Sequence, residues 1–481
     1  MNGAQMLLAA PEFWVLALAC VVMIVDLFLR EPRRGIIHML AMLTVIFAAI
    51  ITLRGGYVVN GVQSVTAFSD SFIRDPMGDV LKVFSFVIMG LIFTYSKFYL
   101  RSFKMFRGDF FTLSLFALLG VMLLISANSM LMIYLGLELI SLSVYALVAF
   151  NRESGRGTES AMKYFVLGSM ASGMLLYGMS MIYGATGTLI LPEIADAIRT
   201  QGADDILLIF GLVFVVVGIA FKFGVVPFHM WIPDVYEGAP PAVTLFISSV
   251  PKLAAFAMAY RFLSSGLGDL HVHWQSMLAS LAVLSIILGN LAAIMQTNIK
   301  RMLAYSTISH MGFVMLGLLP GTAFGFGASM YYVIVYGVMS VASFSMVILL
   351  SSNGVEAEFL EDFKGLNRRN PFYAAIMGLV MFSMAGVPPM VGFFAKLMVL
   401  KAVIEAGMMW LAIAAVVFAV IGAFYYLRVV KYMYFDEPEN EAPVTAPVDF
   451  GAALTLNGAM ILGLGIFSSS LIAICMTSFG L

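Results

Sequence analysis

The 481-residue chain is 62% hydrophobic and only 11% charged, and its mean hydropathy is +0.99. Soluble domains carry about 25% charged residues, so this composition excludes a soluble globular protein and predicts a polytopic membrane protein. A formal net charge of −1 gives no indication of nucleic-acid binding. Cys20 and Cys475 are too few for a cysteine-held iron–sulfur or zinc centre, and their wide separation argues against a disulfide framework.

Apolar runs of about 20 residues predict an all-α protein with about fourteen transmembrane helices. The first segment, MNGAQMLLAAPEF, has no basic stretch, so we expect the first span to be retained rather than cleaved as a signal peptide. The predicted spans lie near residues 12–30, 36–54, 77–99, 109–127, 129–150, 160–184, 204–228, 239–263, 274–296, 301–319, 325–351, 371–407, 408–434 and 450–477.

Basic residues divide unevenly between the two sides that these spans define. If the N-terminus lies outside, few basic residues fall on the outer side, among them Arg54, Arg74, Arg199 and Arg261. This asymmetry is what the positive-inside rule expects, and it places both termini on the outer side. The inner segments would carry Arg30, Arg33, Arg34, Lys97, Arg101, Lys104, Arg107, Arg152, Arg156, Lys300, Arg301, Lys364, Arg368, Arg369 and Lys431.

Prolines predict two discontinuous helices. Pro227, Pro233, Pro240 and Pro241 interrupt the stretch Phe221–Met258, and Pro388-Pro389 lies inside the long run 371–407. Broken helices at membrane depth are tolerated only where they are buried in protein or line a wet cavity. Because the two breaks are five spans apart, the units around them would have opposite orientations, as in the inverted repeats of transporters.

The predicted organisation therefore has four parts. Helices 1–3 occupy residues 1–108 and are followed by a first five-helix repeat (helices 4–8) over 109–263. A second, inverted repeat (helices 9–13) covers 274–434, and helix 14 covers 450–477.

Four ionisable side chains lie deep in predicted spans: Glu138, Lys222, Lys252 and Lys396. Such residues are costly in hydrocarbon and usually mark ion or proton paths. We expect the Lys222 ammonium to lie beside the unpaired carbonyls where its helix ends, and Glu138 to be its partner. The alternatives are a structural hydrogen bond for Glu138 and snorkelling to the interface for Lys222.

The remaining ionisable residues are weaker candidates. His310 could relay protons, or it could be a satisfied interhelical histidine. Lys163 opens the sixth span, where it either snorkels inward or assists proton uptake, and Lys401 is expected to snorkel.

Two further sets of charges have structural interpretations. Asp79 and Lys82 are spaced as an i,i+3 ion pair near the outer face. Asp234 and Glu237 are expected to cap short helices. No phosphate loop, metal cluster, haem motif or nucleophile elbow occurs in the sequence, so no redox or hydrolytic chemistry is expected from this chain.

Three motifs resemble the antiporter-like membrane subunits of respiratory complex I: PFHMWIPDVYEGAPPAVTLFIS between Lys222 and Lys252, KRMLAYSTISHMGF, and MFSMAGVPPMVGFFAKLMVL. Glu138 in the fifth span fits the same family, and the similarity covers nearly the whole chain. L- and M-type members usually read Ala-His where this chain has Val235-Tyr236. M-type members carry a glutamate at the position of Lys396, and L-type members have a C-terminal extension that this chain lacks.

The resemblance implies a fourteen-helix subunit of a membrane arm in the bacterial inner membrane, with both termini periplasmic. Glu138 and Lys222 would form the input ion pair, Lys252 the central relay and Lys396 the terminal site. No cofactor is expected in this chain. NADH, FMN, iron–sulfur clusters and quinone would belong to partner subunits, and the neighbours would be K- and M-type membrane subunits and lipids.

The leading hypothesis is a non-redox subunit of a proton-translocating NADH:quinone oxidoreductase. The nearest rival is a subunit of a free-standing cation/proton (Na⁺/H⁺) antiporter, which would work without NADH-oxidising partners. A passive membrane anchor, in which the lysines only satisfy one another, is the third hypothesis.

Overall fold

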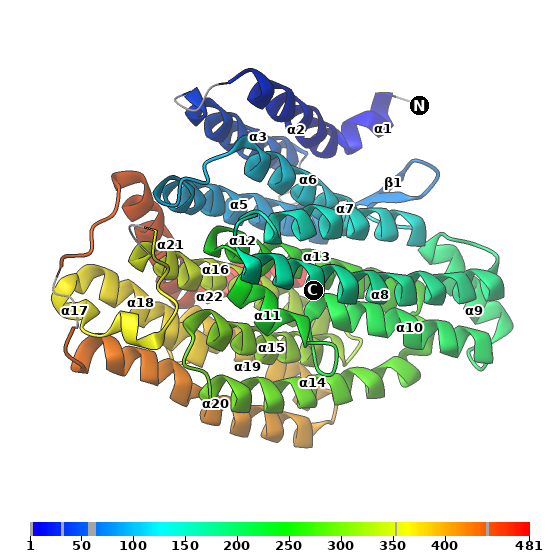
Figure 1. Cartoon of the computed structure of the whole chain (residues 1–481). Helices are drawn as coiled ribbons and strands as arrows, with labels where there is room; N and C mark the ends of the chain where they lie inside the picture. Colours follow the sequence, from blue (N-terminus) through cyan, green and yellow to red (C-terminus); the bar gives the residue numbers. More distant parts are fainter. Residues whose placement is uncertain (1–2, 30–32, 56–63, 352–353, 439–441) are drawn as a thin grey trace.

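The computed structural model describes residues 3–29, 33–55, 64–351, 354–438 and 442–481. Arg30, one of the predicted inner-side cations, lies outside these ranges. Long helices run side by side, with the short helix α9 (Leu191–Gln201) at one end of the molecule and α17 (Leu366–Arg369) at the other (Figure 1). Within the described ranges, the sheet is the two-stranded hairpin of β1 (Val65–Ala67) and β2 (Phe72–Arg74).

The helices confirm an all-α polytopic membrane fold. Twelve described segments are long and apolar enough to cross a membrane. The other two predicted spans correspond to α15 (Ile299–Leu318) and to the pair α18 (Pro371–Ala385) and α19 (Val391–Glu405). The twelve are α2 (Ala10–Phe28), α3 (Gly35–Arg54), α5 (Pro76–Ser102), α6 (Gly108–Ile125), α7 (Met130–Val148), α8 (Gly155–Thr186), α10 (Ile206–Phe223), the segment Pro241–Gly266, the segment Gly268–Ile294 containing α14 (His271–Ile294), α16 (Ala323–Leu350), α20 (Met409–Phe435) and α21 (Val448–Ile466).

Both predicted helix breaks are present. α10 ends at Phe223 and is followed by the short α11 (Trp231–Gly238), while α18 ends at Ala385 and α19 begins at Val391. Gly224 (φ 73°) and Gly386 (φ 89°) end the first half of each, in a left-handed conformation that favours glycine. The two motifs therefore turn the chain at the same relative place.

A third break was not predicted from the sequence. It divides the eighth span into α12 (Pro241–Ile247) and α13 (Val250–Tyr260). Pro251 has no amide proton and its ring would clash with a carbonyl of the preceding turn, so one continuous helix is excluded here. The hydroxyls of Ser248 and Ser249 donate to the Leu245 carbonyl at 3.2 and 2.6 Å. The break places Lys252 at the start of α13.

The last predicted span is also divided, into α21 and α22 (Ser468–Thr477), at Phe467. α9 was not predicted because it does not span the membrane. Its apolar residues Leu191, Ile194 and Ile198 are buried on one face, and it lies at the end of the helical body (Figure 1). A short helix, α1 (Gly3–Leu8), precedes α2.

α2 and α3 form a separate layer along α5 and α6 (Figure 1). The predicted Asp79–Lys82 pair is wrong, because each residue has a closer partner in the tertiary structure. Asp79 pairs with Arg74 of β2 at 3.0 Å, and Lys82 pairs with Glu12 of α2 at 2.5 Å; all four side chains are buried. The Lys82–Glu12 pair joins α2 to α5, and Arg74 also donates to the Thr52 carbonyl of α3 at 2.9 Å, so both contacts hold the first layer against the rest of the molecule.

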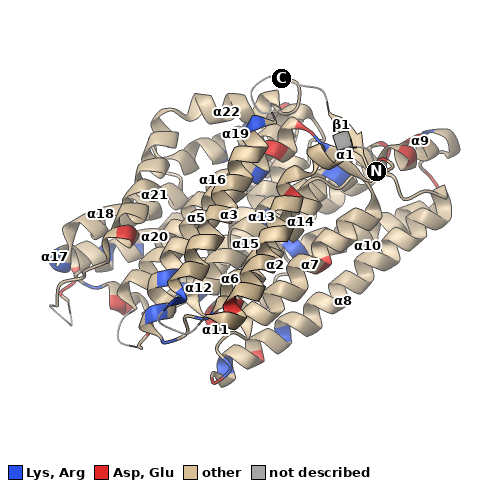
Figure 2. Ribbon diagram, turned by 90° about the horizontal axis from the view of Figure 1, so that it is seen from above, with Lys and Arg blue, Asp and Glu red and all other residues tan. Residues whose placement is uncertain are grey.

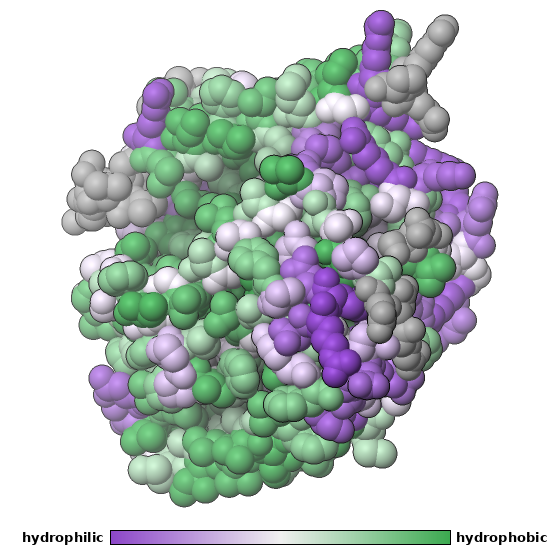
Figure 3. Space-filling model, turned by 90° about the vertical axis from the view of Figure 1, so that its left-hand side faces the viewer, coloured by the Kyte–Doolittle hydropathy of each residue, from purple (hydrophilic) through white to green (hydrophobic). Residues whose placement is uncertain are grey.

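Charged residues gather at the ends of the helices, with a few within the helical body (Figure 2). Figure 3 views the end that carries α17, where hydrophilic side chains are concentrated between apolar flanks. This distribution is typical of a protein whose helix ends meet the two membrane surfaces.

Candidate functional site

The ammonium of Lys252, a residue of α13, lies at the C-terminal end of α10, the first half of the first broken helix. Its ammonium donates to the carbonyl oxygens of Lys222 (3.2 Å) and Phe223 (2.9 Å), the last two residues of α10. Carbonyls in the last turn of a helix have no intrahelical partner and carry partial negative charge. Lys252 is 1% exposed, so these contacts replace the water that its charge would otherwise require.

The Lys222 ammonium does not lie beside the carbonyls at the end of its own helix, as was predicted from the sequence. Its ammonium donates to the Ser141 hydroxyl on α7 at 2.8 Å, whereas the helix-end carbonyls are taken by Lys252. The difference arises because a lysine cannot easily fold back onto carbonyls of its own turn, while α13 approaches them from outside.

Glu138 is half-buried on α7, one turn before Ser141, and accepts a hydrogen bond from Ser172 of α8. Among the described ion pairs there is none between Glu138 and Lys222. Glu138 and Lys222 are each hydrogen-bonded to a serine rather than to each other, so their role as an input pair stays a prediction.

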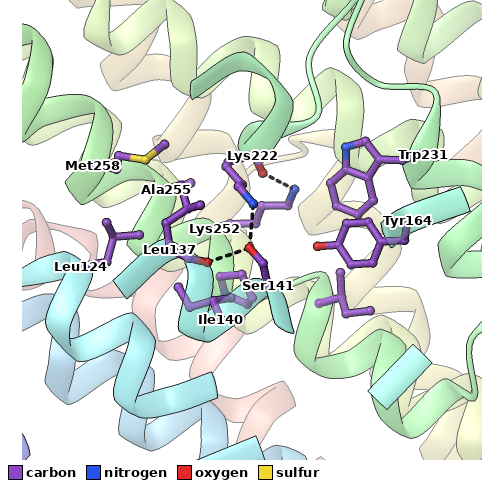
Figure 4. Close-up of a pocket in the computed structure, with 12 residues that line it drawn as sticks. Leu124, Leu137, Ile140, Ser141, Tyr164, Lys222, Trp231, Lys252, Ala255 and Met258 are labelled. Carbon is purple, nitrogen blue, oxygen red and sulfur yellow. Dashed lines mark hydrogen bonds between the residues drawn. The ribbon is translucent and has the colours of Figure 1, made fainter. Parts of the chain in front are cut away.

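A small cavity joins the two lysines. Its volume is about 30 Å³, and it is lined by Ser141, Lys222 and Lys252 together with Tyr164, Trp231 and apolar side chains (Figure 4). A cavity needs roughly 10–15 Å³ and two to four polar partners to hold one water. The space between Lys222 and Lys252 meets both conditions.

Aromatic rings of the first break wall this cavity. Trp231 donates from its indole nitrogen to the Phe221 carbonyl at 3.1 Å and stacks on Tyr164 with a 4.6 Å centroid separation. The Lys252 ammonium lies 5.2 Å from the centre of the Trp231 ring. A cation over an indole face is stabilised without a carboxylate partner.

The second break has the same arrangement around Lys396. Its ammonium donates to the carbonyl oxygens of Met384 (3.1 Å) and Ala385 (2.8 Å) at the end of α18 and lies 5.6 Å from the Phe313 ring centre. Unlike Lys252, it is half-buried. Each broken helix thus ends on a lysine ammonium beside an aromatic ring.

His310 lies beside the second site. The buried imidazole shares hydrogen bonds with the hydroxyls of Tyr332 (2.7 Å) and Tyr426 (3.0 Å). Tyr332 stacks on Phe313, the ring under Lys396, and Ser306 extends the network from Tyr426 at 2.5 Å. The Phe313 ring therefore lies against both Lys396 and the His310 network, although no hydrogen bond between described residues joins His310 directly to Lys396.

Lys163, the remaining predicted candidate, lies beside α11 and not beside Lys222, Lys252 or Lys396. Its side chain is 45% exposed and pairs with Glu159 (2.8 Å) and Asp234 (2.9 Å). Arg301 of α15 also pairs with Asp234 (3.0 Å) and with Glu237 (2.7 Å). The expectation that the two acids cap short helices is wrong, because they form ion pairs that link α11 to α8 and α15.

The electrostatics of Asp234 follow from these pairs. Partial burial raises the pKa of its carboxyl, but the hydrogen bonds and charges of Lys163 and Arg301 outweigh that effect and hold the pKa below its usual range. Asp234 therefore remains ionised in the folded protein at neutral pH.

Several residues at these sites were not found from the sequence. Ser141 follows Glu138 by three residues, so helical spacing could have placed both on one face. Tyr332 and Tyr336 are four residues apart on α16, and the Tyr336 hydroxyl donates to Thr307 at 2.7 Å. No three His, Cys, Asp or Glu side chains of the described ranges are grouped so as to hold a metal ion.

Comparisons with known proteins agree with this architecture. The NADH-quinone oxidoreductase subunit N of Thioalkalivibrio sulfidiphilus is 53% identical over 465 residues, which cover 96% of each chain. A chain of respiratory complex I from Thermus thermophilus, solved with bound aureothin, has a TM-score of 0.82 at 28% identity and covers 96% of this chain and 98% of its own. A chain of the Mrp complex from Dietzia sp. reaches a TM-score of 0.87 at 18% identity, covering 100% of this chain and 97% of its own, which shows a shared fold.

Residues 127–422 match the membrane-protein family described as NADH:quinone oxidoreductase/Mrp antiporter, and this region holds both broken helices and all four deep ionisable residues. The near-full-length identity goes further than the shared fold. The chain belongs to the family of NADH-quinone oxidoreductase subunit N.

Proposed function

We propose that the chain moves protons through a line of buried side chains, as a non-redox subunit of a proton-translocating NADH:quinone oxidoreductase. The observation that carries this proposal is the pair of broken helices, each ending on the ammonium of a lysine, Lys252 or Lys396. A buried lysine held by carbonyl dipoles rather than by a carboxylate can lose its proton without leaving an unpaired counter-ion.

The first step would be set by Glu138. A change in the distance between Glu138 and Lys222, arising in neighbouring subunits, would change the proton affinity of Lys222. Lys222 would pass its proton to Lys252 through water in the cavity between them. Moving one charge across a membrane costs about 2.3 kcal/mol per 100 mV, which pKa changes of a few units can supply.

The second half of the path would run toward Lys396. The buried Tyr236 hydroxyl makes no hydrogen bond with a residue that the structure describes, and its ring lies 6.4 Å from Trp231 and 5.9 Å from Phe344. It is a polar group placed between the first break and α16. His310 with its two tyrosines would then pass the proton to Lys396, with release on the outer side.

The organisation and surroundings belong to the same proposal. Residues 109–263 and 274–434 would be the two inverted repeats, with 1–108 and 450–477 packed around them. NADH, FMN, iron–sulfur clusters and quinone would be held by partner subunits, and K- and M-type membrane subunits would be its neighbours. The chain would lie in the bacterial inner membrane with both termini periplasmic, and Lys163 would assist proton uptake at the inner surface.

A free-standing cation/proton antiporter is less well supported. The likeness to the Mrp chain is 18% identity, whereas the NADH-quinone oxidoreductase relative is 53% identical over nearly the whole chain. NADH-oxidising partners that copurify with the chain support the first function, and sodium-dependent exchange in their absence would support the second.

The decisive experiment measures NADH-driven proton translocation in tight membrane vesicles for Glu138→Ala and Lys222→Ala. Both substitutions should sharply reduce pumping and the coupled NADH oxidation, because both act at the first step. Lys401→Ala is the matched control, since Lys401 is exposed on α19 and paired only with Glu405 among the described ion pairs. Normal pumping by either test variant would reject the relay, and loss of assembly with pumping intact per assembled complex would favour the passive anchor.

A further inference from the structure

A second cavity lies outside the proton line, where α2 ends, α6 begins and α7 ends. Its volume is about 400 Å³, far larger than the cavity between Lys222 and Lys252. The basic residues of the neighbouring loops place this end of the helices on the predicted inner side. The lining residues that matter here are Arg107, Arg152, Asp26, Asp109 and the apolar set Met23, Leu27, Leu113 and Phe116.

The polar lining has an excess of positive charge. The negative charge of Asp26 is balanced by Arg34, with which it forms an ion pair at 3.8 Å. Arg107 and Arg152 make no ion pair or side-chain hydrogen bond with any described residue, and together they exceed the remaining carboxylate, Asp109, by one positive charge. An arginine fork suits phosphate oxygens because it can donate two parallel hydrogen bonds.

The apolar lining is open to the side of the molecule. Leu27 is 80% exposed and Met23 is 45% exposed, and these two side chains of α2 form this flank of the cavity. In a membrane protein this flank contacts acyl chains. The cavity therefore offers two exposed arginines at one end of the helices, where the headgroups of a membrane would lie, next to exposed apolar side chains of α2.

We infer that this cavity binds an anionic glycerophospholipid with one phosphodiester, its phosphate between Arg107 and Arg152 and an acyl chain against α2 and α6. Basic pockets between transmembrane helices on the cytoplasmic side recognise lipid headgroups of this kind. Free phosphate would use the arginines but not the apolar wall. The single excess positive charge matches one phosphodiester.

The bound lipid would have a structural consequence for the first layer. α2 meets α6 at this cavity, and the carboxylate of Asp26 lies so close to Gly108 that a side chain there would overlap it. A lipid wedged between α2, α6 and α7 would fill the remaining space in this joint. The site is independent of the proton relay, since none of the relay residues lines it.

The test is photo-crosslinking of the purified whole complex with a phosphatidylglycerol that carries a diazirine in its acyl chain. Peptide mapping should find label on segments 23–27 of α2 and 107–116 of α6, which carry the apolar lining of the cavity. Unlabelled phosphatidylglycerol should compete, whereas phosphatidylcholine and inorganic phosphate should not. Each basic residue near an anionic headgroup contributes about fivefold, so Arg107→Gln with Arg152→Gln should weaken labelling about 30-fold.

Two further variants make the result specific. Arg33→Gln with Lys104→Gln removes two exposed charges from the same end without touching the cavity, and it should label like the wild type. Ala146→Trp fills the cavity from an exposed position of α7 with all charges kept, and it should abolish labelling even if the arginine variant does not assemble. Equal competition by phosphatidylcholine, competition by inorganic phosphate, equal loss in the control variant, or label absent because a partner subunit covers these segments would each overturn the proposal.

Discussion

In both broken helices a lysine ammonium binds the carbonyls at the end of the first half, but the two lysines come from different kinds of element. At the end of α10 the capping ammonium comes from another helix: Lys252 of α13 reaches the carbonyls and is almost completely buried. At the end of α18 the ammonium comes from the second half of the same broken helix: Lys396 of α19 reaches back to it and is half-buried. The first break also has a second lysine, Lys222, connected through Ser141 to the helix that carries Glu138.

This difference indicates which break is more constrained. Removing a buried cap leaves carbonyls that water cannot easily reach, whereas a half-buried cap can be replaced by solvent. The first break should therefore be the more sensitive of the two, and its sensitivity should extend to the serine beside Lys222.

The largest effect is expected for Lys252→Met. It removes two charge-assisted hydrogen bonds from the end of α10, each worth about 1.5–3 kcal/mol. If a coupled step loses the free energy of one of these bonds, it slows roughly ten- to a hundredfold. NADH-driven proton translocation in vesicles measures it, with Lys401→Met as the exposed lysine control. A rate close to that of the wild type would show that the buried cap is dispensable.

Lys396→Met should slow translocation about tenfold, a smaller effect than that of Lys252→Met. It removes the terminal protonatable group, but Lys396 is less completely buried than Lys252, so the helix end that it leaves uncapped is less enclosed. The same vesicle assay compares it directly with Lys252→Met. If the two substitutions were equally severe, or their order were reversed, exposure would not be what separates the two breaks.

Ser141→Ala tests the part that only the first break has. It removes the hydroxyl that accepts from Lys222, and the neighbouring cavity lets water take its place, so proton translocation should fall only about three- to fivefold. Ser141→Thr keeps the hydroxyl and should retain most activity. An alanine variant as inactive as Lys252→Met would mean that Ser141 is an obligatory step.

The smallest effect concerns the half-helix α11, whose Asp234 is paired with Lys163 and Arg301. Because the folded pKa of Asp234 lies below its ordinary value, its stabilisation is fully present above about pH 4 and is lost as the pH falls through the folded pKa. Asp234→Asn should lower stability by about 1 kcal/mol or less at pH 7.

Chemical unfolding of the purified complex at several pH values checks this prediction. The gap between Asp234→Asn and the wild type should close as the pH is lowered. A gap that widened in acid would contradict the assigned direction of the pKa.

Much of the architecture could be predicted because its signals are local. Runs of apolar residues located the spans, and prolines located both breaks. The break at Ser248-Ser249 was missed although Pro251 marks it, because the neighbouring prolines had already been assigned to the interruption before it. The short non-spanning α9 has no comparable signal in a search for long apolar runs.

Partners of charged side chains were harder to predict. Asp79 and Lys82 have the spacing of a local pair, yet each is taken by a residue from another element. Asp234 and Glu237 could be recognised as polar groups near helix ends, but their cations come from α8 and α15. Sequence spacing predicts only contacts within one helix, whereas the partner in a buried ion pair depends on which helices pack together.

The amino-acid sequence by itself determined that this chain spans a membrane many times, that two of its helices break, and that Glu138, Lys222, Lys252 and Lys396 lie deep within it, because hydropathy, proline chemistry and the cost of buried charge are properties of short segments. Only the tertiary structure decided that Lys252 rather than Lys222 caps α10 and that serines bind Glu138 and Lys222. It also decided that two arginines without an ion pair among the described residues line one cavity with apolar side chains of α2, α6 and α7. Those outcomes depend on which helices pack together, and that choice is made by contacts between residues far apart in the chain.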